Sequence, residues 1–73
     1  MKLPADLSGR ELVEVLLRVG FVVSGQRGSH IILRLGNPYA RVVVPDHNTV
    51  RPGTLHQILV EAGLTVEQLS ELR

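Results

Sequence analysis

The spacing of apolar residues changes along this chain, and the changes predict the order of its elements. From residue 8 to residue 19 the apolar positions recur at helical spacing, as on one side of a helix. From residue 21 to residue 44 short β-favouring runs are separated by glycine or proline, as in strands joined by turns. Helical spacing returns at Pro52, a residue that a first helical turn tolerates, and continues to Gly63.

Two helix starts carry recognisable capping residues. The Ser8 hydroxyl can accept from an amide of the first turn while Glu11 reaches back to Ser8, so we expect a helix over residues 8–19, closed by Gly20. Thr65 and Gln68 repeat the pattern and predict a last short helix.

The run from Ser29 to Leu35 alternates as a half-buried strand does. One face carries Ile31, Leu33 and Leu35, and the other carries His30, Ile32 and Arg34. We expect the first set to pack against helices and the second to project from an open face. A third strand over residues 41–44 should end at Pro45, which cannot donate to a strand ladder.

Short connections between three successive strands imply an antiparallel meander with the helices on one face. The predicted fold is therefore α+β, in the order α-β-β-β-α, with the whole chain (residues 1–73) as a single domain. Aromatic residues make up only 3% of the chain, so its core must be built from Val, Leu and Ile.

Composition narrows the setting in which the protein works. The chain has no cysteine, which excludes disulfides and thiolate zinc sites and favours a reducing, cytoplasmic location. Residues 1–6 lack the apolar run of a secretory signal, and no stretch approaches the ~20 apolar residues that cross a bilayer. We therefore expect no membrane association.

Positive charge is concentrated in the middle of the chain. Asp46 is the only acidic residue between positions 18 and 58, against five arginines: Arg18, Arg27, Arg34, Arg41 and Arg51. Since both ends of the chain are net acidic, this distribution predicts one surface suited to an anionic partner.

His30 is the strongest candidate for chemistry, because imidazole gives and takes protons near neutral pH. A plain surface histidine is the alternative interpretation. Gly28 can let a backbone or phosphate approach closely, and the Ser29 hydroxyl can bond a phosphate oxygen, although turn formation alone would also explain Gly28. Guanidinium groups bind phosphate bidentately, so Arg27, Arg34 and Arg41 could surround His30 with phosphate ligands or could form a solvated face.

Several other chemistries find no support in the sequence. The spacing of His30, His47 and His56 matches no metal-ligand pattern, so no metal site is expected. No nucleophile elbow marks an activated serine, and no Walker-type loop marks a nucleotide site. No small-molecule cofactor is therefore expected.

A series of short motifs, in order, covers nearly the whole chain. These are Ser8-Gly9-Arg10-Glu11, Gly20-Phe21, Gln26-Arg27-Gly28-Ser29-His30, Val44-Pro45 with His47, Pro52-Gly53-Thr54-Leu55 with Ile58-Leu59, and Ala62-Gly63-Leu64. Together they strongly resemble the HicA toxin family. The combination of Gly-Ser-His with Pro-Gly-Thr-Leu at this distance is more specific than either motif alone.

The resemblance implies a fold like that of a double-stranded-RNA-binding domain. It also implies a ribonuclease toxin that cleaves messenger RNA, is neutralised by a HicB antitoxin, and uses His30 as its catalytic histidine. In the simplest metal-free mechanism the 2′-hydroxyl of the RNA is the nucleophile, His30 is the general acid or base, and Arg27, Arg34 and Ser29 hold the phosphate.

Two other functions stay open at this point. A non-catalytic RNA-binding module of the same fold would recognise an A-form helix by its shape and phosphates. A protein-interaction domain would use the open sheet face only to dock a partner. Both leave Gly28-Ser29-His30 without a role, and the sequence therefore favours the enzyme.

Overall fold

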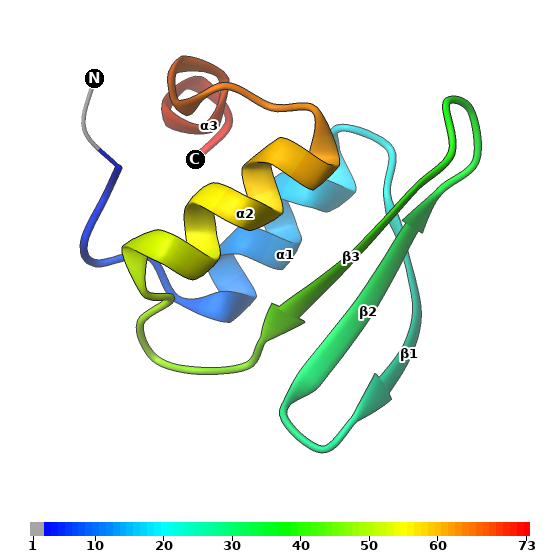
Figure 1. Ribbon diagram of the computed structural model, residues 1–73, viewed down its shortest axis with the longest axis horizontal. Coiled ribbons are helices and arrows are strands. Elements are labelled where there is room, and N and C mark those ends of the chain that lie inside the picture. The colour runs from blue at the N-terminus through cyan, green and yellow to red at the C-terminus, as the bar shows by residue number, and fades with distance from the viewer. Residues whose placement is uncertain (1–2) are drawn as a thin grey trace.

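The structure is a computed structural model that describes residues 3–73 of the chain (Figure 1). Within these residues the elements follow one another as α1, β1, β2, β3, α2 and α3. The strands lie side by side in sequence order, and both pairings are antiparallel. The predicted α+β meander, similar to a double-stranded-RNA-binding domain, is confirmed.

Helix α1 (Gly9–Arg18) begins and ends within one residue of the predicted range. Its capping box is formed as expected, because the Ser8 hydroxyl accepts from the Glu11 amide and the Glu11 carboxylate accepts from the Ser8 amide, each at 3.1 Å. These bonds satisfy amides that a helix start otherwise leaves unpaired. Gly20 follows the helix with a φ of 107°, a conformation that glycine adopts without steric cost.

The sheet consists of β1 (Val22–Arg27), β2 (His30–Leu35) and β3 (Ala40–Pro45). Alternation along β2 is as predicted: Ile31 and Leu33 are buried, and His30 and Arg34 are exposed. On β3 the buried positions are Val42 and Val44, so this strand turns the same face inward.

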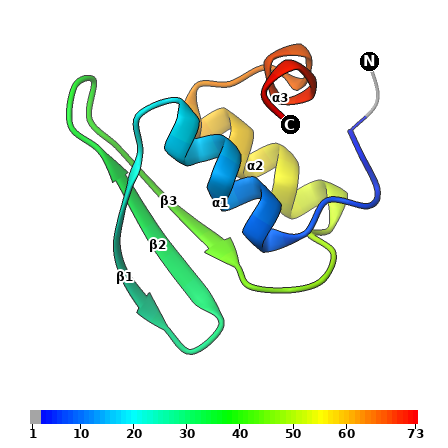
Figure 2. The same cartoon turned by 180° about the vertical axis from the view of Figure 1, so that it is seen from behind.

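Helices α1 and α2 (Pro52–Ala62) both lie on one side of the sheet, as two opposite views show (Figure 1, Figure 2). The buried sheet residues and these helices share one apolar core, which contains no buried polar side chain in the described part of the chain. No described helix covers the other face, and that face carries His30. No helix within residues 3–73 is long and apolar enough to span a membrane.

The last helix, α3 (Val66–Leu72), packs against α1 and buries Leu69. Arg73 then joins the two ends of the described chain, with its Nη1 3.0 Å from Asp6 Oδ1 and its Nη2 3.5 Å from Glu11 Oε2. The hydrogen bond from Arg73 lowers the pKa of the Asp6 carboxyl. The pKa of Glu11 is also lowered, chiefly by the hydrogen bond from the Ser8 amide.

Candidate active site

His30 is the first residue of β2 and follows a two-residue turn formed by Gly28 and Ser29. Gly28 adopts a φ of 56°, which favours glycine over residues with a side chain and explains its place in this turn. Across the sheet His30 is paired with Arg27 on one side and with Pro45 on the other. Gly28, Ser29, His30 and Arg27 therefore lie together at one end of the sheet.

The other two predicted arginines lie farther along the sheet. Arg34 and Arg41 face each other across β2 and β3, four residues from His30, which corresponds to about 13 Å of extended strand. Arg34 is held in place, because its Nε donates to Ser24 Oγ at 3.3 Å and its Nη1 donates to Tyr39 Oη at 3.0 Å. The three arginines thus do not form a ring around His30; only Arg27 is its direct neighbour.

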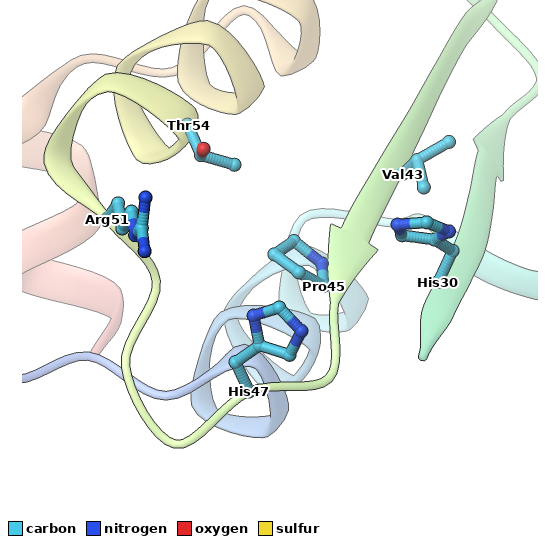
Figure 3. A pocket seen from close by; sticks show the side chains of 6 residues that line it. All are labelled: His30, Val43, Pro45, His47, Arg51 and Thr54. Atoms are coloured by element: carbon cyan, nitrogen blue, oxygen red, sulfur yellow. The ribbon is translucent and has the colours of Figure 1, made fainter. Parts of the chain in front are cut away.

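A second set of neighbours of His30 comes from a different part of the chain. A pocket of about 440 Å³ opens beside it, lined by His30, Val43, Pro45, His47, Arg51 and Thr54 (Figure 3). His47 and Arg51 belong to the segment between β3 and α2, and Thr54 lies in the first turn of α2. We name this space the His30–His47 pocket.

Backbone hydrogen bonds fix the segment that carries His47 and Arg51. The amide of Asp46 donates to the Ser29 carbonyl oxygen at 2.6 Å, which ties the exit of β3 to the turn before His30. The His47 carbonyl oxygen accepts from the Gly9 amide at 2.9 Å. Farther on, the amide of Val50 donates to the Leu7 carbonyl oxygen at 2.8 Å, and Val50 is fully buried. The segment between β3 and α2 is therefore anchored by its backbone to the rest of the domain.

The charge around the pocket is positive. Arg51 is the N-cap residue of α2, and its side chain makes no hydrogen bond or ion pair with any residue in the range 3–73. The start of α2 adds the positive end of a helix dipole. The nearest acidic residue of this segment, Asp46, is already paired with Arg10 at 3.3 Å. A pocket of this kind suits an anion such as a phosphodiester.

Metal-ligand chemistry has no comparable support. No group of three or more His, Cys, Asp or Glu side chains in the described part of the chain is arranged to hold a metal ion. His47 and His30 are two imidazoles with no carboxylate lining the same pocket.

A protein-family model matches most of the chain. The model described as the HicA toxin of bacterial toxin–antitoxin systems matches residues 9–64. The chain belongs to the HicA toxin family. Its members are the toxins of toxin–antitoxin systems, so this HicA protein has an antitoxin as its expected partner. A search among curated proteins gives no match to the chain.

The matched range contains every residue that lines the pocket and also contains Gly9. The HicA resemblance seen in the sequence is thereby confirmed. Three polar pocket residues were not assigned a role by the sequence: His47 appeared as a rejected metal ligand and within a motif, Arg51 only in the charge distribution, and Thr54 only within a motif. The segment that carries His47 and Arg51 is placed by long-range backbone hydrogen bonds, which no local pattern encodes.

Proposed function

We propose that this HicA toxin is a metal-independent endoribonuclease that cleaves messenger RNA in the cytoplasm, with His30 as a general acid or base. The observation that supports it best is the position of His30. An exposed imidazole on the uncovered sheet face opens onto a pocket that also contains an unpaired guanidinium, among the residues in the range 3–73. Imidazole can transfer protons near neutral pH, and the guanidinium can bind a phosphate.

The reaction that fits these groups begins within the RNA itself. The 2′-oxygen gives up its proton and attacks the adjacent phosphorus, the bond from phosphorus to the 5′-oxygen breaks, and that oxygen takes up a proton. The products are a 2′,3′-cyclic phosphate and a 5′-hydroxyl. The protein supplies proton transfer and positive charge, and both act more strongly when they are held in place before the substrate binds.

The open sheet face supplies the rest of the RNA-binding surface in this proposal. Arg27 lies directly across from His30, and Gly28 and Ser29 form the turn beside it, where a phosphate can approach the backbone closely. Arg34 and Arg41 lie about 13 Å farther along the strand, where they would contact phosphates away from the cleaved bond.

The decisive experiment compares purified wild-type protein with His30→Ala on a defined messenger RNA. His30→Ala should lower the cleavage rate by about 10²- to 10⁴-fold, the usual contribution of a general acid or base. Its circular dichroism should be unchanged, since the side chain is exposed. His56→Ala is the matched control, because His56 is an exposed histidine of α2 outside the pocket. RNA binding without cleavage by the wild type would instead identify a non-catalytic RNA-binding module.

The antitoxin is proposed to be HicB-like and to cover the open sheet face, burying His30 together with the arginines of that face, Arg27, Arg34 and Arg41. The basic character of this face favours an acidic partner surface, which would accelerate association. Hydrogen exchange on the complex, coexpressed from the neighbouring open reading frame, should show protection of residues 27–34. Equal exchange in the free and bound protein would show that the antitoxin acts from another surface.

A further inference from the structure

The proposed cleavage needs two proton transfers at different places. One group removes the proton of the 2′-hydroxyl, and another delivers a proton to the leaving 5′-oxygen. In a displacement at phosphorus the entering and leaving oxygens are on opposite sides of the phosphorus atom, roughly in line. A single imidazole cannot lie on both sides at once, so His30 leaves one transfer unassigned.

The structure brings a second imidazole to the same pocket. His47 lies on the segment after β3, and His30 lies on β2, so the two rings reach the pocket from different elements (Figure 3). Pro45 lies between them in this view. Both histidines are exposed, so a bound RNA strand can reach them. The third histidine of the chain, His56, does not line the pocket.

Arg51 provides the positive charge that the phosphate needs. It lines the pocket on the side of α2, together with Thr54 (Figure 3). Among residues 3–73 its guanidinium has no hydrogen-bonding partner, whereas Arg34 is held by Ser24 and Tyr39. A free guanidinium that lines the same pocket as two imidazoles can bind the non-bridging oxygens of a phosphodiester bidentately. The remaining lining residues, Val43 and Pro45, are apolar.

Backbone hydrogen bonds restrain the two segments that carry the histidines. Asp46 is bonded to Ser29, the residue before His30, and the His47 carbonyl is bonded to Gly9. The His47 amide donates to the Pro45 carbonyl oxygen at 2.9 Å. A segment restrained on both sides of His47 presents its ring without the entropy loss of ordering a mobile loop, which is the usual benefit of a preformed catalytic arrangement.

From this geometry we infer that His47 is the second proton-transfer group of the proposed cleavage and that Arg51 holds the scissile phosphate between the two histidines. The inference rests on the proposed function, because it assigns groups to that same reaction. One histidine takes the proton from the 2′-oxygen and the other gives its proton to the 5′-oxygen. The pair exchanges its protonation states in the course of one cleavage.

The first test uses His47→Ala and His47→Gln, with His56→Ala as the control. Both His47 variants should lose about 10²- to 10⁴-fold in rate, since glutamine can hydrogen-bond but cannot transfer protons near neutral pH. The wild-type rate should fall at both low and high pH, because one histidine must be neutral while the other is protonated. Each single variant should lose one limb of that profile, and His56→Ala should keep both limbs.

The second test uses an RNA whose leaving 5′-oxygen is replaced by sulfur, which departs without being protonated. The variant that lacks the general acid should recover on this substrate, and the variant that lacks the general base should not. Recovery of one of the two, His30→Ala or His47→Ala, identifies the acid and supports the pair. Recovery of neither would contradict the assignment of a second proton donor.

The third test addresses Arg51. Arg51→Ala should lower kcat/KM strongly, and Arg51→Lys should restore part of the activity, because lysine keeps the charge but not the bidentate geometry. Equal activity of Arg51→Ala and the wild type would remove Arg51 from the phosphate site.

Different results would contradict the ribonuclease activity and the role of His47. If the wild type does not cleave RNA, or if His30→Ala cleaves at the full rate, the proposed function is wrong. If cleavage depends on His30 while His47→Gln folds normally, keeps the full rate and keeps both limbs of the pH profile, the ribonuclease stands and the role of His47 is wrong.

Discussion

The amide of Gly9 donates a hydrogen bond of 2.9 Å to the carbonyl oxygen of His47, so the first residue of α1 holds the segment that forms one wall of the pocket. This close approach leaves no space for a side chain. A Cβ atom on Gly9 would collide with the carbonyl oxygen of Pro45. Glycine is required here by close approach of two backbones, although its position at a helix start gives no hint of this.

Replacing Gly9 with alanine should therefore destabilise the protein and impair the pocket together. We expect a decrease of about 1–3 kcal/mol in the free energy of unfolding, typical of overpacking, and a lower rate of RNA cleavage because the segment carrying His47 must move. Gly53→Ala is the matched control, since a Cβ at this first-turn position of α2 meets nothing within 4 Å. Urea unfolding of the two variants compares them directly, and equal midpoints would show that the collision with Pro45 is relieved at no cost.

Cleavage should not depend on a divalent metal ion and should depend on the ribose. The reaction proposed for His30 and His47 uses the 2′-hydroxyl as the nucleophile, so an RNA with a deoxyribose 5′ to the scissile bond should resist the protein. Cleavage of the all-ribose strand should continue in excess EDTA, measured on the same gel. Loss of activity in EDTA, or efficient cutting of the deoxy-substituted strand, would point to a water or hydroxide nucleophile instead.

The arginines of the open face should contribute to RNA binding through contacts with phosphates, which salt weakens. Arg27→Ala and Arg34→Ala should each reduce RNA affinity and lower the slope of log K against log salt by about 0.7 for each single-strand phosphate that is no longer neutralised. Arg18→Ala serves as the control, because Arg18 lies on α1, on the helix-covered side of the sheet. Filter binding at several salt concentrations gives the slopes. An unchanged slope for Arg27→Ala would place the RNA on another surface.

Acid should weaken the ion pairs between the two ends of the chain. The pKa values of Asp6 and Glu11 are lowered in the folded state from their ordinary values of 3.8 and 4.5. As the pH falls through these values, the unfolded state therefore binds more protons than the folded state does. The contribution of these two carboxyls to the free energy of unfolding should therefore be complete above this range and be lost as the pH falls below it. Arg73→Ala removes the main cause of the Asp6 shift and should make the decrease shallower. Denaturation curves from pH 2 to pH 6, about the range in which these carboxyls titrate, measure this decrease in the wild type and in Arg73→Ala. Identical pH dependence in the two proteins would mean that the ion pairs of Arg73 are not formed in solution.

The sequence predicted the fold well because the signals that determine it are local. The capping box of Ser8 and Glu11 marks a helix start, and the alternation around His30 and Leu33 assigns the two faces of β2 without reference to any other strand. Strand β1 was harder to interpret. Its register shifts between Val23 and Gly25, and the helices pack mainly over β3 rather than over β1, so Val22 and Val23 are both at least half exposed.

The candidate site could be predicted only in part. His30, Gly28 and Ser29 are neighbours in sequence, and the hairpin brings Arg27 to them. His47 and Arg51 depend instead on hydrogen bonds to residues near the start of the described chain, and these bonds have no local sequence signature. The sequence left open whether Arg34 and Arg41 surround His30 or form a solvated face. Cross-strand pairing puts these two arginines opposite each other, four residues along β2 from His30.

The bonds that hold the histidine pair run from backbone to backbone. The link between the two histidine-bearing segments is a hydrogen bond from the Asp46 amide to the Ser29 carbonyl oxygen. Every residue has a backbone carbonyl, and every residue except proline has a backbone N–H. The additional ion pair of Asp46 with Arg10 is solvent-exposed and adds little. The link between the two histidine-bearing segments therefore does not depend on which side chains stand at positions 29 and 46, as long as position 46 is not a proline.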